Sequence, residues 1–309
     1  MKKLLIICYG ILLLAYALPP AGGVLRRCVG AADEGGKTVP VLTGGKKESL
    51  SMTEYLTGVL AAEMPASFHE EALKAQAVAA RTYALYCLQS GKHGGNLCTN
   101  AGCCQAYMDA SQRRGRWGGD APKYERRILH AVNATAGETL RYNGEPVQAV
   151  FHASSYLRTE SSAEVWEALP YLVSVSSPES PETVPGLVST VELTAEELRN
   201  AIENARPEAV FPEDAQSWIE GIERDASGRV KRLRIAGTEL SGRELRSLFL
   251  LRSTAFDLSY TAGKFLFTVT GFGHGVGMSQ QGANVMAQQG ADYTAILAHY
   301  YPSTTLRKD

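Results

Sequence analysis

Two helical patterns on either side of Pro65 constrain the fold more than any other feature of this sequence. Between residues 52 and 60, apolar side chains recur at the i, i+3, i+4, i+7 and i+8 positions that form one face of a helix. Ser51 and Glu54 form a capping-box pattern at its start, and Pro65 ends it. A second helix of about 20 residues is expected after a repeated capping box at Ser67 and Glu70. The folded part should therefore begin near residue 49 with two consecutive helices.

The remainder of the chain mixes strand and helix patterns. Two extended runs flank Asn143 and Gly144, the strongest short hairpin signal in the sequence, and residues 228–237 alternate like a strand. Residues 91–127 are rich in Gly and Cys and are expected to form a loop. Helical patterns occupy residues 124–135, 193–206 with Thr194 as cap, 241–251 with Ser241 at the start, and 292–301.

We therefore predict an α+β fold in which helices pack on a mixed or antiparallel sheet. A single domain would cover residues 49–309, with room for a small inserted subdomain at about residues 192–251.

The composition excludes some classes of function. The 309 residues are 45% hydrophobic and 20% charged, with a formal net charge of -1 at pH 7, which is ordinary for a globular protein. This balance gives no global attraction to nucleic acid, which depends on clustered Lys and Arg. Only residues 113–127 are locally basic, and they suit either a solvated loop face or an edge that binds an anion or a polymer.

The N-terminus has the pattern of a membrane anchor or an export signal. Lys2 and Lys3 precede an uncharged run, residues 4–18, that is rich in Leu and Ile. Residues 19–25 extend this run to a length that can span a bilayer, which favours a single-pass anchor over residues 1–25. Ala15 and Ala17 fit a cleavage site, so secretion after signal removal is the alternative. In both cases a linker, residues 26–48, and the folded part would lie outside the cytoplasmic membrane.

The cysteines are crowded into one region. Cys8 lies in the apolar run, Cys28 lies in the linker, and Cys98, Cys103 and Cys104 fall within seven positions. Such crowding is typical of a metal cluster or of a local disulfide, and the spacing leaves both open.

Glu63 is an acid on the apolar face of the first helix. It lies seven residues after Leu56, a spacing that returns to the same side of a helix. Burial and the partial negative charge at a helix C-terminus both raise the pKa of a carboxyl group. A carboxyl that stays protonated near neutral pH suits general acid catalysis on a glycosidic oxygen. The alternative is a frayed last turn in which Glu63 reaches water or pairs with Arg81.

Several segments together resemble the stage II sporulation protein D family. These segments are EYLTGVLAAEMP, EALKAQAVAARTYA, FHAS with a following TE and VW, GFGHGVGMSQQGA and ILAHYYP, in the expected order across residues 49–306. The resemblance implies a membrane-anchored lytic transglycosylase that acts on peptidoglycan during engulfment of the forespore. It also implies that Glu63 is the catalytic acid/base, that the glycan has been stripped of peptides by a partner amidase, and that a membrane partner of the engulfment machinery is involved.

This reaction needs only one carboxylate. Ordinary glycosidases use two, one for the leaving group and one as nucleophile or water activator. In a lytic transglycosylase the C6 hydroxyl of the MurNAc ring attacks its own C1, so no water and no cofactor are required. Glu63 would protonate the oxygen between MurNAc C1 and GlcNAc C4 and accept the proton of the C6 hydroxyl.

Three residues of the second helix are candidates for substrate binding. Arg81 and Tyr83 are expected to orient Glu63 or to bind sugar hydroxyls, with simple packing as the alternative. Gln76 lies on the apolar face, where a buried amide needs partners, so a structural hydrogen bond and a sugar contact are both open.

The segment after the hairpin supplies further candidates, because loop residues that follow a strand often line a site. In the family this loop usually contains a glycine pair, where this chain has Tyr156 and Leu157. Glycine permits positive φ and close backbone approach, so the replacement puts the usual glycan contact in doubt. The candidates here are Ser154, Ser155, Thr159 and Glu160.

The glycine-dense segment GFGHGVGMSQQGA, residues 271–283, is suited to a concave surface ahead of a helix capped by Ser279. It lacks the Gly-Lys-Ser/Thr ending of a phosphate loop, which argues against nucleotide binding. His274 and Gln280 are expected to contact sugar in a cleft, with a rigid structural turn as the alternative.

His93, Cys98, Cys103 and Cys104 are candidate ligands for a structural zinc ion. Some members of the family that the chain resembles carry a zinc site near the acid. Cys98 and Cys104 are the preferred thiolates, with His93 or Cys103 as the third ligand, and a disulfide is the alternative. Zinc would shape the loop, because the proposed reaction has no water nucleophile to activate.

Two other functions compete with the transglycosylase. One is a non-catalytic glycan-binding module that stimulates a cell-wall amidase, and the other is a metal-dependent hydrolase that uses the Cys/His cluster. The products separate them, because a transglycosylase forms anhydro-sugars, a binding module forms no product and a hydrolase forms reducing ends.

Overall fold

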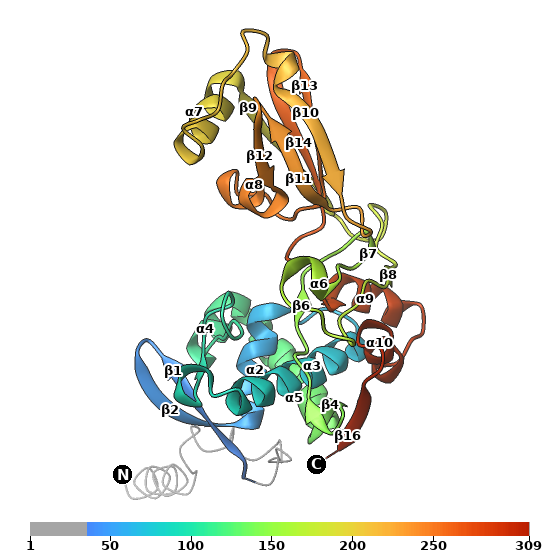
Figure 1. Cartoon of the computed structure of the whole chain (residues 1–309). Helices are drawn as coiled ribbons and strands as arrows, with labels where there is room; N and C mark the ends of the chain where they lie inside the picture. Colours follow the sequence, from blue (N-terminus) through green and yellow to red (C-terminus); the bar gives the residue numbers. More distant parts are fainter. Residues whose placement is uncertain (1–35, 309) are drawn as a thin grey trace, which may run out of the picture.

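The computed structural model describes residues 36–308, which form two lobes (Figure 1). The base lobe contains residues 36–187 and 271–308, and the inserted lobe contains residues 188–270, from strand β9 to strand β14. Each lobe has its own buried hydrophobic cluster. Helices and mainly antiparallel strands occur in both, which confirms the α+β class.

The helices of the base lobe are α2 (Met52–Glu63), α3 (Glu70–Gln89), α4 (Ala110–Trp117), α5 (Ala121–Ala134), α6 (Ser162–Val165), α9 (Gln280–Gln288) and α10 (Tyr293–Tyr300). Its strands are β1 (Thr38–Thr43), β2 (Lys46–Ser51), β3 (Leu97–Cys98), β4 (Glu138–Tyr142), β5 (Glu145–Pro146), β6 (Phe151–His152), β7 (Leu157–Arg158), β8 (Ser176–Ser177), β15 (Met278–Ser279) and β16 (Thr305–Lys308). The predicted hairpin at Asn143 and Gly144 is confirmed as β4 and β5.

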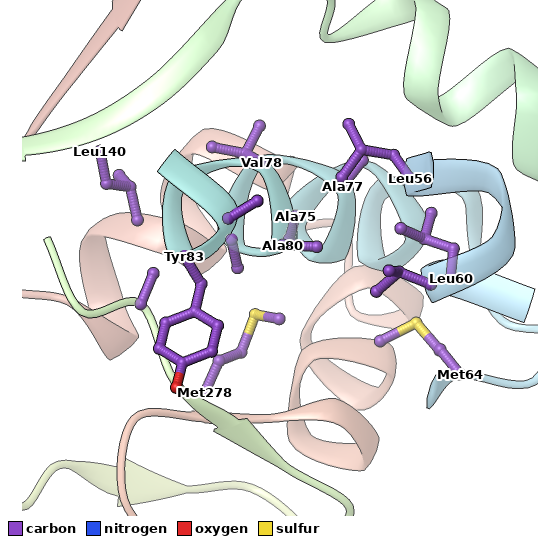
Figure 2. Close-up of a cluster of buried hydrophobic side chains, with 14 of the residues drawn as sticks. Leu56, Leu60, Met64, Ala75, Ala77, Val78, Ala80, Tyr83, Leu140 and Met278 are labelled. Atoms are coloured by element: carbon purple, nitrogen blue, oxygen red, sulfur yellow. The ribbon is translucent and has the colours of Figure 1, made fainter. Parts of the chain in front are cut away.

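Helices α2 and α3 lie at the centre of the base lobe. Figure 2 shows Leu56 and Leu60 of α2 near Ala77 and Ala80 of α3 in the buried cluster. Alanine permits close approach of the helix backbones, and α3 is buried on most of its sides, as expected for a central helix.

The expected helix boundaries are largely correct, with one error. Ser51 caps α2 by accepting a hydrogen bond from the Glu54 N–H, and α3 has the expected 20 residues. The cap of α3 is His69, whose Nδ1 accepts from the Glu71 N–H, and not Ser67. The capping box predicted at Ser67 is therefore wrong by two residues.

Two segments expected to lack regular structure contain helices or strands. The predicted linker, residues 26–48, includes β1 and part of β2, which pair with each other antiparallel. The predicted loop at residues 91–127 includes α4, which begins with a full capping box at Asp109 and Gln112. Strand β2 is largely exposed and α4 is mostly polar, so neither shows a clear apolar periodicity.

The inserted lobe is larger than the predicted subdomain at 192–251. Its strands form two three-stranded sheets, with the orders β13-β14-β9 and β10-β11-β12. Thr194 and Ser241 cap α7 and α8 through full capping boxes, as predicted. The elements are β9 (Val188–Thr194), α7 (Ala195–Ala205), β10 (Ile219–Arg224), β11 (Val230–Ile235), β12 (Thr238–Ser241), α8 (Gly242–Leu248), β13 (Phe256–Thr261) and β14 (Lys264–Thr270).

The glycine-dense segment returns the chain from the inserted lobe to the base lobe (Figure 1). Gly271, Gly273, Gly275 and Gly277 all have positive φ, and a Cβ at Gly277 would lie 2.1 Å from the Val150 carbonyl oxygen. Only glycine fits this path without strain. The segment ends at Ser279, which caps α9 as predicted by accepting from the Gly282 N–H.

Across residues 36–308, the structure contains no helix of sufficient length and apolarity to cross a bilayer. The anchor predicted over residues 1–25 lies outside the described residues.

Candidate functional site

Glu63 is the last residue of α2 and is half-buried. Its Oε1 accepts a hydrogen bond from the backbone N–H of Ala106 at 2.7 Å. Burial raises the pKa of Glu63, and the Ala106 hydrogen bond opposes this rise only in part. The expected direction of the pKa shift is therefore confirmed.

Two arginines hold the chain on either side of Glu63. Arg116 of α4 donates to the Ala61 carbonyl at 3.0 Å, and Arg127 of α5 donates to the carbonyls of Ala66 and Phe68 at 2.8 and 2.6 Å. These bonds satisfy carbonyls that have no partner within α2 or in the turn that follows it. The basic stretch at 113–127 therefore fixes the position of the acid. The density of arginine in this stretch is the sequence signal for this role, which differs from the solvated face or binding edge that the sequence predicts.

A cleft of about 320 Å³ opens in the base lobe. Trp166 forms part of its wall, with 51% of its surface exposed and its ring centroid 5.1 Å from that of His274. Glu63 is not itself a lining residue, but its partner Ala106 follows the lining residues Cys103 and Cys104 in the chain. The residues that line the cleft are Tyr83, Lys92, Ala101, Gly102, Cys103, Cys104, Gln148, Val150, Phe151, Trp166 and His274.

His274 presents a neutral imidazole to the cleft. Burial, with a smaller contribution from Arg246, lowers the pKa of His274 to about 4. Its Nδ1 accepts from the backbone N–H of Val276 at 3.1 Å. A neutral ring that accepts at Nδ1 carries its proton on Nε2, so His274 can act as a hydrogen-bond donor.

Tyr83 and His274 are the two predicted substrate-binding residues that line the cleft. Trp166, Lys92, Gln148 and Phe151 also line it and were not among the predicted site residues. An exposed tryptophan in a Glu-Val-Trp segment was the signal that could have identified Trp166.

Other predicted residues are buried. Gln76 Oε1 accepts from Gln280 Nε2 at 3.4 Å, so these two amides form a structural pair between α3 and α9. Arg81 is buried and donates to the carbonyls of Val132 and Glu138, which connects α3 to α5 and β4. A contact of these side chains with sugar stays a prediction.

The segment after β6 lies beneath the inserted lobe. Its four predicted substrate-binding residues, Ser154, Ser155, Thr159 and Glu160, are all buried and lie outside the lining of the cleft, so their contact with substrate also stays a prediction. Leu157, in place of one glycine of the family pattern, has a φ of 63°, which glycine adopts easily. The turn keeps a glycine-like conformation despite the replacement.

The four predicted zinc ligands are brought together. The nearest donor atoms of His93, Cys98, Cys103 and Cys104 all lie within 4.8 Å of one another, and His93 Nε2 is 3.0 Å from Cys103 Sγ. A tetrahedral zinc ion with Zn–S bonds of about 2.3 Å places its sulfur ligands about 3.8 Å apart, so this donor set fits zinc. The cysteines at positions 87, 98, 103 and 104 are free, so the disulfide alternative is not formed in this structure.

The sequence is similar to proteins of known family. A family model described as "Stage II sporulation protein" matches residues 44–142, and one described as a domain of unknown function matches residues 188–277, close to the bounds of the inserted lobe. Stage II sporulation protein D of Bacillus amyloliquefaciens is 36% identical over 258 residues, which covers 82% of this chain and 73% of the relative.

Two proteins of Bacillus subtilis (strain 168) are also similar. Its stage II sporulation protein D is 35% identical over 264 residues, covering 84% of this chain and 75% of the relative. A protein named "Amidase enhancer" is 28% identical over 302 residues, covering 81% of this chain and 40% of the relative. The extent of the first two matches shows that this chain belongs to the stage II sporulation protein D family.

Proposed function

We propose that this protein is a lytic transglycosylase that cleaves the MurNAc–GlcNAc β-1,4 bond of peptide-stripped peptidoglycan strands during engulfment in sporulation. The observation that carries the proposal is Glu63, a half-buried carboxyl of raised pKa at the end of a helix, whose hydrogen-bond donor Ala106 lies two residues after the cleft-lining Cys104. Membership of the stage II sporulation protein D family supports the sporulation role.

Glu63 acts first as an acid and then as a base. Its proton passes to the oxygen that leaves MurNAc C1, and the C1–O bond breaks. The C6 hydroxyl of the same ring forms the new bond to C1, and its proton returns to Glu63. The product is a 1,6-anhydroMurNAc end, and the enzyme regains its starting protonation state without water or an external base.

The aromatic wall of the cleft suits a sugar ring. Trp166 offers an exposed indole held against His274, and both rings line the cleft. We expect Trp166→Ala to weaken binding of a soluble glycan by about 10-fold, the scale of a lost aromatic contact. Calorimetric titration measures this, with Leu250→Ala as the control because Leu250 is exposed on the inserted lobe and outside the cleft.

A structural zinc ion is part of the proposal. Three thiolates and one imidazole would complete a tetrahedral shell with no open position, which is typical of a structural site. His93 has a φ of 51°, and this unusual backbone conformation directs its ring to the thiols. When bound, the ion would hold the loop whose Ala106 N–H donates to Glu63.

We place the protein at the cell membrane, anchored through residues 1–25 with its folded part extracytoplasmic, or secreted after signal cleavage. Its proposed partners are glycan strands, a cell-wall amidase and a membrane component of the engulfment machinery.

A second candidate function is a glycan-binding stimulator of an amidase. The similarity to a protein named "Amidase enhancer" favours it, although that match covers only 40% of the relative.

Product analysis separates the two functions. Purified full-length protein is incubated with peptide-free glycan strands, and the products are identified by mass spectrometry. We expect anhydroMurNAc ends from the wild type and from Glu196→Gln, an exposed control in α7, and none from Glu63→Gln. Intact strands with all three proteins, combined with measurable glycan binding, would instead support the amidase stimulator.

A further inference from the structure

A buried polar contact joins the two lobes at Arg229, which immediately precedes β11. Arg229 is 3% exposed and reaches out of the inserted lobe, where its Nη2 donates to Ser155 Oγ at 3.1 Å. Its Nε lies 3.7 Å from Glu160 Oε2. Ser227, in the same turn, donates to Glu160 at 2.7 Å. The turn between β10 and β11 of the inserted lobe therefore packs against the base lobe.

The contact continues as a directed chain of hydrogen bonds. Ser155 Oγ is 2.6 Å from His152 Nε2, and His152 Nδ1 is 3.2 Å from the Val276 carbonyl oxygen. A carbonyl can only accept, so Nδ1 carries the proton of the neutral ring and Nε2 accepts from the Ser155 hydroxyl. Ser155 in turn accepts from Arg229. A single arrangement of the protons satisfies all three hydrogen bonds. The chain of bonds ends at Val276, two residues beyond His274.

Arg229 also packs on the other side of this loop. Gly275 has a φ of 85°, and a Cβ at this position would lie 2.5 Å from Arg229 Cζ. The guanidinium plane therefore occupies the space that any other residue would fill with its side chain. The Glu160 N–H donates to the Gly275 carbonyl at 2.8 Å. Gly275 is therefore held both by Arg229 and by Glu160, which itself contacts Arg229.

We propose that Arg229 is a positioning residue that sets His274 in the cleft by holding Gly275 and Val276 from the inserted lobe. Arg229 Nε and Nη1 have no hydrogen-bond partner within residues 36–308, so this buried arginine is poorly suited to stability alone. The planar, multi-donor guanidinium instead contacts the glycine backbone and Ser155 at once, which a lysine cannot do. The proposal concerns loop geometry and does not depend on the transglycosylase reaction.

Hydrogen exchange tests this inference directly. Full-length wild type, Arg229→Met and the control Arg232→Met are compared by mass spectrometry without glycan. Arg232 lies on β11, three residues after Arg229, but is exposed and pairs with Glu223 inside its own lobe. We expect Arg229→Met to speed exchange of the amides at residues 271–277 at least about 5-fold, while the control and the core strands of the inserted lobe keep wild-type protection. Unchanged exchange at 271–277, or loss of protection confined to the inserted lobe, would overturn the proposal.

A double-mutant cycle distinguishes positioning from general destabilisation. Gly275→Ala should also speed exchange of the 271–277 amides, because its Cβ displaces the guanidinium. The clash with the guanidinium is absent in the Arg229→Met background, while the strain of alanine at a φ of 85° remains in both backgrounds. The alanine should therefore add less there than in the wild type. Fully additive effects would contradict a contact between Arg229 and Gly275. Because neither measurement uses glycan, failure of the enzyme proposal would be seen separately in the product analysis.

Discussion

The end of α2 and the junction of the lobes each contain an acid whose pKa is raised by burial. The residues that surround these two acids differ. Glu63 is half-buried, with a single backbone donor at Ala106, two residues after the cleft-lining Cys104. Glu160 is 3% exposed and lies among Asp225, Ser227 and Arg229. Burial, followed by the nearby Asp225 carboxyl, raises the pKa of Glu160 to about 7.

This comparison teaches that a perturbed carboxyl is a candidate acid only where substrate can reach it. By pKa alone Glu160 would be an equally good choice. Its remaining surface is covered by the inserted lobe, and both its oxygens accept hydrogen bonds, from the Ser161 N–H and the Ser227 hydroxyl. The environment of Glu160 suits a structural contact, and that of Glu63 suits proton transfer.

The largest expected effect comes from removing each acid in turn. Glu63→Gln should lower the rate of anhydroMurNAc formation by about 10²–10⁴-fold, the contribution typical of a general acid. Glu160→Gln should lower it by no more than about 10-fold, since it acts only through the geometry of the Gly275 loop. Initial rates on peptide-free glycan measure both, and equal losses would remove the distinction between the two acids.

The second-largest effect is expected from loss of the Cys/His cluster, which supports the loop that contacts Glu63. Cys98→Ser is expected to abolish binding of about one zinc ion per chain and to lower activity by about 10–100-fold, because the loop that carries Ala106 loses its support. Metal analysis and glycan cleavage are measured beside Glu196→Gln, which alters an exposed side chain in α7 of the inserted lobe, outside the four-residue cluster. Full activity in metal-free Cys98→Ser would contradict a structural role for zinc.

The raised pKa of Glu160 is tested by the pH dependence of the free energy of unfolding. A carboxyl whose pKa rises from 4.5 to about 7 on folding binds more protons in the folded state than in the unfolded state within that window. The free energy of unfolding therefore falls as pH increases from about 4.5 to about 7, and this group adds no further pH dependence above or below that range. Glu63 contributes in the same direction because burial raises its pKa too.

Denaturant unfolding between pH 4 and pH 8 should show a smaller decline for Glu160→Gln than for the wild type. A curve for Glu160→Gln that parallels the wild type would show that Glu160 has an ordinary pKa in the folded protein.

The smallest effect concerns the turn that leads to Glu160. Leu157 is 63% exposed and adopts a φ of 63°, so Leu157→Gly loses little burial and relieves backbone strain. We expect the free energy of unfolding to rise by up to about 1 kcal/mol, the balance of that relief against the greater freedom of glycine in the unfolded chain. Thermal unfolding measures this, with Val210→Gly as the comparison because Val210 is exposed and its φ is not positive. A destabilised Leu157→Gly variant would show that this leucine has contacts that stabilise the turn.

Local patterns predicted the secondary structure well where a cap and a period coincide. The sequence predicts Thr194, Ser241 and Ser279 as caps, because a cap is a hydrogen bond to an N–H two or three residues away. Strand β2 and helix α4 do not follow from local patterns, because β2 is largely exposed and α4 is mostly polar, so neither shows a clear apolar period.

The sequence by itself determined the α+β class, the helix that ends at Glu63, the raised pKa of that acid and the four residues of the Cys/His cluster. Each depends on residues near one another in the chain, or on a periodicity that buries one face. Only the tertiary structure decided that Ala106 donates to Glu63 across 43 positions, that Trp166 lies against His274, and that Arg229 reaches Ser155 across 74 positions. Such contacts depend on how elements far apart in the sequence pack together, within the base lobe or between the lobes, and no local period in the sequence encodes them.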